Sequence, residues 1–122
     1  MKRVCWYRKL YMTEKARKKR YKIVWKVNHK AGMINTYLVT VPIKGKNQLE
    51  IINSSELLHK HFNLVTTYIV GIAIGHEDAL ELVEKIVEDV YEKTKGTDIR
   101  GFFRKDLRNI IPSQLLSEYS ID

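Results

Sequence analysis

The pattern of apolar and polar positions predicts three strands along the chain. Residues 4–12, VCWYRKLYM, are rich in aromatic and β-branched side chains and predict a short strand. The apolar run 37–41 predicts a second strand, which must end at Pro42 because proline cannot donate to a strand ladder. Residues 65–75, VTTYIVGIAIG, are apolar almost throughout, which predicts a strand buried on both faces.

Residues 13–32, TEKARKKRYKIVWKVNHKAG, allow two interpretations. As a strand, residues 21–27 alternate passably. As a helix, the lysines fall on one arc at about 100° per residue and the apolar side chains fall on another. The apolar arc holds Ala16, Ile23, Val24, Val27 and Ala31. Thr13 suits an N-cap and Gly32 suits the C′ position, and the helix explains far more of the segment, so we expect a helix.

Residues 76–95 carry the clearest helical pattern. One apolar stripe runs along them, with Glu77 and Asp78 in the first turn and Gly96 at the expected C′ position. The stripe consists of Ala79, Leu80, Val83, Ile86, Val87, Val90 and Tyr91. A further helix is expected over 54–62, with Ser54 as its cap.

The order strand, helix, strand, helix, strand, helix predicts an α/β fold. We expect a three-stranded, mostly parallel sheet with packed helices (β-α-β-α-β-α), in a single domain that spans residues 1–122. The alternative is an α+β fold in which 21–27 pairs with 37–41 as an N-terminal hairpin. Residues 105–122, interrupted by Pro112, are expected to form a C-terminal extension.

Charge is distributed unevenly. The 122 residues have a net charge of +8, but residues 1–31 hold twelve Lys/Arg and one acid, whereas the rest hold ten Lys/Arg and thirteen Asp/Glu. The basic N-terminal third is therefore +11 and the remainder is −3. Such a division indicates a surface for an acidic partner, or for the acidic half of another copy.

Composition also limits the location. A single cysteine, Cys5, excludes an internal disulfide and fits a reducing compartment. No uncharged run approaches the ~20 residues of a membrane helix, and the first residues lack the apolar core of a signal peptide. We expect a cytoplasmic protein with no membrane partner.

The sequence predicts no catalytic residue, cofactor or metal site. Gly71 and Gly75 match neither nucleotide-binding glycine pattern. His59 and His61 are two residues apart, so on a helix they point to different sides and do not converge on a metal. The sequence therefore leaves enzymatic activity open and favours a protein that is not an enzyme.

The lysine side of 15–30 is the candidate site. A solvated surface is the plain interpretation, and the sharper one is contact with nucleic acid or another polyanion without sequence specificity. The expected site residues are Lys15, Arg17, Lys18, Lys19, Lys22, Lys26, Lys30 and Trp25, with Trp25 and Tyr21 available to stack on bases. Arg3, Arg8 and Lys9 are expected to extend it. The alternative is an adaptor or self-associating domain, in which the basic helix meets the 77–92 helix of a second copy.

Four stretches carry a family resemblance: LYMTEKARKK, YLVTV, YIVGIAIGHEDALELVEKIVEDVY and TDIR. Through them, residues 10–103 resemble a group of small uncharacterised bacterial proteins. The resemblance implies an accessory bacterial protein, and it implies no activity, cofactor or site residue.

Overall fold

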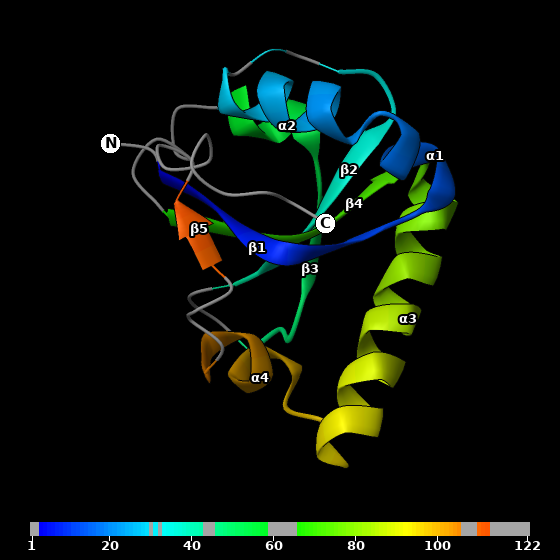
Figure 1. Cartoon of the computed structure of the whole chain (residues 1–122), viewed down its shortest axis with the longest axis vertical. Helices are drawn as coiled ribbons and strands as arrows, with labels where there is room; N and C mark the ends of the chain where they lie inside the picture. The colour runs from blue at the N-terminus through cyan, green and yellow to red at the C-terminus, as the bar shows by residue number, and fades with distance from the viewer. Residues whose placement is uncertain are drawn as a thin grey trace.

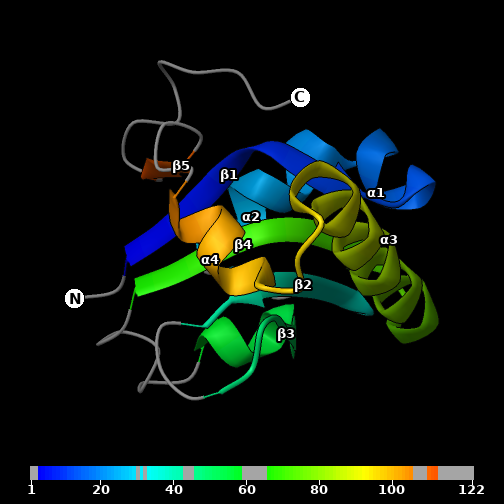
Figure 2. The same ribbon diagram turned by 90° about the horizontal axis from the view of Figure 1, so that it is seen from below.

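A mixed sheet lies between two layers of helices (Figures 1 and 2). The computed structural model describes residues 3–29, 31, 33–42, 46–58, 66–105 and 110–112. Their elements are β1 (Arg3–Met12), α1 (Glu14–Lys18), α2 (Arg20–Asn28), β2 (Thr36–Val41), β3 (Glu50–Asn53), the 3₁₀ helix η1 (Ser54–Leu58), β4 (Thr66–Ile74), α3 (His76–Thr94), α4 (Ile99–Lys105) and β5 (Ile110–Pro112).

The expected three-stranded, mostly parallel sheet is wrong. The five strands lie in the order β3-β2-β4-β1-β5, which can be followed in Figure 2. Among the described strands, only β1 and β4 run parallel; β2 is antiparallel to both β3 and β4, and β5 is antiparallel to β1. The architecture is therefore α+β, with a mixed sheet.

The reason is that β1 ends and β2 begins at the same end of β4. The amide of Thr13, just after β1, donates to the carbonyl of Ile72 in β4 at 3.4 Å. Thr36, the first residue of β2, pairs with Ile74 at the end of the same strand. The chain between these points goes out through α1 and α2 and returns, so β2 must run back along β4.

The alternative α+β class is confirmed, but its N-terminal hairpin is wrong, because residues 20–28 are helical. The expected 13–32 helix is confirmed over much of its length, but it is broken at Lys19, whose backbone has φ −115° and ψ 17°. Thr13 precedes α1 with extended backbone, and its hydroxyl makes no capping hydrogen bond. Lys30 and Gly32 lie outside the described residues.

Each face of the sheet has its own apolar core. Under α1 and α2, the core is built on β1, β2 and β4 around Trp6, Leu38 and Ile72. The indole Nε1 of Trp6 donates to Asn28 Oδ1 at 3.0 Å, which attaches α2 to β1. On the opposite face, α3 and α4 cover a core that includes Phe103. The basic helix α2 and the acidic helix α3 thus lie on opposite sides of the sheet.

The strand expected over 65–75 is confirmed as β4, which is central and buried on both faces. Ile69 and Ile72 belong to one core, and Val70 belongs to the other. Val70 is an extra residue opposite β2, because Val39 pairs with Gly71 while the next residue pairs with Ile69. This bulge shifts the alternation along the strand.

Residues 50–58 differ from expectation. Glu50–Asn53 forms β3, an edge strand that the sequence pattern did not predict, and pairs with β2. The helix expected over 54–62 appears as η1, a 3₁₀ helix, and 59–62 lie outside the described residues. Of the expected C-terminal extension, the described segment β5 pairs with β1.

The expected 76–95 helix is confirmed as α3, but its buried stripe was partly misplaced. Leu82 is buried in place of Leu80, which is 48% exposed. Val87 and Tyr91 are exposed as well. At the end of the helix, Lys95 rather than Gly96 takes the left-handed conformation, with φ 58°.

Candidate polyanion-binding surface

The two short helices α1 and α2 place their basic side chains on one side of the molecule. Ala16 of α1 and Ile23, Val24 and Val27 of α2 are buried in the same core. Since these residues face the sheet, the opposite sides of both helices face solvent. The break at Lys19 changes the direction of the chain without turning either helix over.

We call this exposed side the lysine surface. It consists of Lys15, Arg17, Lys18, Lys19, Lys22 and Lys26, all exposed except the half-buried Lys26. The structure records no ion pair for any of these six side chains among the described residues. Residues 14–28 contain seven Lys/Arg and one Glu, a net charge of +6. The lysine surface is therefore a concentrated positive charge without an internal counter-charge.

Two aromatic side chains lie beside the lysines. Trp25 is 57% exposed and stacks on the His29 ring, with centroids 4.0 Å apart and planes at 16°. Tyr21 is 70% exposed, and the Arg20 guanidinium lies 4.7 Å from its ring centroid. The predicted candidate Trp25 is thus in a position where an unstacked base could continue an existing stack.

A cavity of about 300 Å³ opens next to the lysines, between α2 and the start of β2. Three lysines contribute to its lining, together with one threonine and an aliphatic floor. The lining residues are Lys19, Lys22, Ile23, Lys26, Met33, Ile34, Thr36 and Ile74. The sequence pattern gave no sign of this cavity, because Ile34 and Ile74 reach it from loops and strands far along the chain.

The expected extension of the basic surface along β1 is not shown. Tyr7 and Tyr11 belong to the core under α3, and the pairing of β1 with β4 is irregular between Trp6 and Tyr11, so alternation does not assign the residues between them to the lysine surface. Lys9 is exposed and Arg8 is half-buried. The side chain of Arg3, like Lys30, lies outside what the structure describes.

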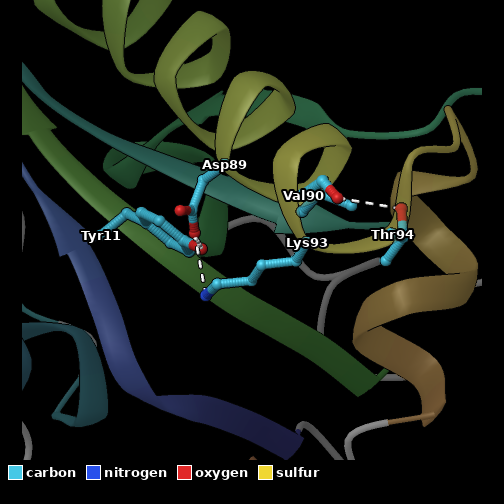
Figure 3. Close-up of polar contacts among 5 residues, drawn as sticks. All are labelled: Tyr11, Asp89, Val90, Lys93 and Thr94. Carbon is cyan, nitrogen blue, oxygen red and sulfur yellow. Dashed lines mark hydrogen bonds and ion pairs between the residues drawn. The ribbon is translucent and has the colours of Figure 1, made fainter.

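A second polar cluster joins β1 to α3 (Figure 3). The Tyr11 hydroxyl donates to Asp89 Oδ2, and the same oxygen lies 3.1 Å from Lys93 Nζ. Burial, and then the hydrogen bond to Asp89, raise the pKa of Tyr11 far above its usual value. The hydrogen bond from Tyr11, opposed by partial burial and assisted by Lys93, lowers the pKa of Asp89.

This cluster holds elements together. Lys93 Nζ lies 5.9 Å from the centroid of the Phe102 ring, so the three side chains link β1, α3 and α4. A neutral phenol donating to an ionised carboxylate is a stable arrangement, and the raised pKa keeps Tyr11 protonated at neutral pH. A nearby cavity of about 350 Å³ is lined by Thr94, Gly96, Asp98, Phe102 and Lys105, and Tyr11 and Asp89 are not among its described lining residues.

Metal binding and membrane insertion can be assessed only in the part of the chain that the structure describes. His59 and His61 lie outside the described residues. Among the residues that are described, no three His, Cys, Asp or Glu side chains come together as a metal site would need. In the same part of the chain, no helix combines the length and apolarity needed to cross a membrane.

Comparison with known proteins adds no family or relative. No protein-family model, no curated protein and no solved structure matches the chain. The lysine surface and its surroundings are therefore the features of the molecule that bear on function.

Proposed function

We propose that this protein is a non-enzymatic binding module that contacts nucleic acid, or another polyanion, through the lysine surface. One observation carries the proposal: six cationic side chains share a surface, none has a recorded ion pair in the described structure, and an exposed tryptophan lies among them. Phosphate groups would supply the missing negative charge and release bound counterions.

The chemistry of the surface favours binding without sequence specificity. Five of the six cations are lysines, whose ammonium groups act as point charges and lack the planar fork that reads a base edge. Trp25 adds a stacking surface that every base can use. Because duplex bases are already stacked, the proposal gives single strands an advantage over duplexes. A cytoplasmic location belongs to the same proposal, since nucleic acid is available there.

Charge reversal tests the proposal. The full chain is titrated against a fluorescently labelled single strand and a duplex in low salt. The test variant carries Lys18→Glu, Lys22→Glu and Lys26→Glu. If the lysines contact about three phosphates, affinity at low salt should fall at least about 100-fold.

The matched control is Lys46→Glu, Lys85→Glu and Lys105→Glu, which changes three exposed lysines elsewhere by the same net charge. We expect this control to lose much less affinity when both variants are also compared at ~0.1 M salt, because charge farther away than about 10 Å is screened there. Equal losses in both variants, or no binding by the parent chain at low salt, would contradict the proposal.

A further inference from the structure

The solvent-facing side of α3 is a second surface, and it carries exposed apolar side chains. Three apolar residues are exposed there, Leu80 at 48%, Val87 at 38% and Tyr91 at 52%. Apolar side chains spaced by seven and then four residues lie along one line of a helix. This is the segment where the sequence pattern predicted burial, yet the core takes Leu82 instead.

A row of glutamates runs beside this line. Glu77, Glu84 and Glu88 have the same spacing and each lies three residues before one of the exposed apolar side chains, so the two rows are adjacent. The structure records no ion pair for these three glutamates within the residues it describes. We call the two rows together the acidic stripe. Helix α3 contains seven Asp/Glu and two Lys, a net charge of −5.

The lysine surface has the complementary composition. A row of lysines on α2, Lys22 and Lys26, lies beside a row of exposed aromatic side chains, Tyr21 and Trp25. At the edge of the neighbouring cavity, Ile34 is 94% exposed. Each surface thus joins a charged row to an apolar row, with opposite charge, which is the arrangement of a helix that docks into a groove.

The rows on α2 and the acidic stripe on α3 do not meet within one chain. Helix α2 packs on one face of the sheet and α3 packs on the other, as Figure 2 shows, so their exposed sides point away from each other. A second copy is a partner that brings the complement of both surfaces at once. We propose that the acidic stripe of one copy docks on the lysine surface of another, with glutamates opposite lysines and the apolar row opposite Tyr21 and Trp25.

The contact would be heterologous, since two different patches meet, and it would form a closed ring or an open chain of copies. Self-association through this contact is a property beyond the proposed function, and it would also regulate polyanion binding. The lysines that bind phosphate are those that bind the stripe, so polyanion binding and self-association exclude each other. A single helix-on-groove contact is at the small end of specific interfaces, and we expect a dissociation constant of about 1–100 μM at low salt.

Sedimentation of the full chain tests the inference. The mean mass should rise with protein concentration in low salt and return to that of the monomer in high salt. Two variants separate the surfaces: Lys22→Glu with Lys26→Glu, and Glu84→Lys with Glu88→Lys. Each variant alone should remain monomeric, because the reversed side chains repel their partners directly and the net charge falls from +6 to +2 over residues 14–28, or from −5 to −1 over α3.

The equimolar mixture of these two variants should associate, since each supplies the surface that the other has lost. The control is Glu50→Lys with Glu56→Lys, which adds the same charge at exposed positions away from α3 and should associate like the parent chain. A parent chain that is monomeric at all concentrations, or a mixture that does not associate, would overturn the inference.

The failure of this inference can be distinguished from the failure of the proposed function. The Glu84→Lys, Glu88→Lys variant keeps the lysine surface and should still bind a labelled oligonucleotide. For the parent chain, an added oligonucleotide should shift assemblies back to one copy. Assemblies that persist with oligonucleotide bound would show that the two activities use different surfaces and would overturn the proposed competition.

Discussion

Replacing Tyr11 with phenylalanine should have opposite effects on stability at neutral and at alkaline pH. The substitution keeps the ring, which stacks near Tyr7 and meets Phe103 edge-on, and removes only the hydroxyl that donates to Asp89. Near pH 7 the variant loses one hydrogen bond to a charged acceptor. Because the Asp89 side chain is about one-third exposed, we expect a loss of about 1–2 kcal/mol in the free energy of unfolding.

The alkaline effect follows from the raised pKa of Tyr11. In the unfolded chain a tyrosine ionises near pH 10, whereas in the folded chain burial and Asp89 keep the hydroxyl protonated at that pH. The stabilisation is therefore complete below about pH 10 and is lost as pH rises above it, by about 1.4 kcal/mol per pH unit. The difference in the free energy of unfolding between the parent chain and Tyr11→Phe should therefore fall to zero about one pH unit above 10.

Urea unfolding of both chains at neutral pH and at several values above pH 10 provides the measurement. At neutral pH the difference corresponds to about 4–8 °C in Tm for a chain of this length. Tyr91→Phe is the matched control, because Tyr91 is exposed and the change should stay within about 0.5 kcal/mol at every pH. A stability difference between the parent chain and Tyr11→Phe that does not change from neutral pH to pH 11 would refute the reasoning.

Three further predictions concern single positions. Asp89→Asn should reduce stability at neutral pH, and the difference from the parent chain should vanish in acid, because the lowered pKa of Asp89 stabilises the fold above about pH 4 and is lost as pH falls; unfolding curves at neutral and acidic pH measure it. Gly75→Ala should cost about 1–3 kcal/mol in urea unfolding, because Gly75 joins β4 to α3 with φ 98°; an unchanged midpoint would contradict the strain. Trp25→Ala should weaken single-strand binding about 5–150-fold and leave Tm nearly unchanged, and an equal loss on duplex would argue against stacking.

Local structure was largely predictable because it depends on neighbouring residues. Helix α3 has a regular apolar period and acidic residues in its first turn, and β4 is an apolar run bounded by a glycine. The break at Lys19 was not predictable from periodicity, because both halves of the segment keep basic residues outward and apolar residues inward.

Topology was not predictable because it depends on where the chain returns. Alternating strands and helices imply parallel pairing only if each connection carries the chain back to the opposite edge of the sheet. Here the return after α2 ends beside Gly75, whose amide donates to the Asn35 carbonyl at 2.8 Å. Because of this contact between distant segments, β2 begins beside the end of β4, where β1 also ends.

The candidate site was predictable in part. The charge asymmetry and the lysine spacing indicated the surface, and the Trp25 side chain is exposed on the same helix as Lys22 and Lys26. The aliphatic residues that line the cavity include Ile34 and Ile74, which no local pattern connects to α2. In the same way, the hydrogen bond between Tyr11 and Asp89 joins residues 78 positions apart.

The salt dependence of oligonucleotide binding is the most direct test of whether the lysine surface binds phosphate. The association constant of a labelled single strand is measured at several salt concentrations for the parent chain and for the Lys18→Glu, Lys22→Glu, Lys26→Glu variant. Each phosphate contact contributes about −0.7 to the slope of log K against log salt, so three lost contacts should make the slope shallower by about 2. The account predicts this change; equal slopes for the two proteins would contradict it.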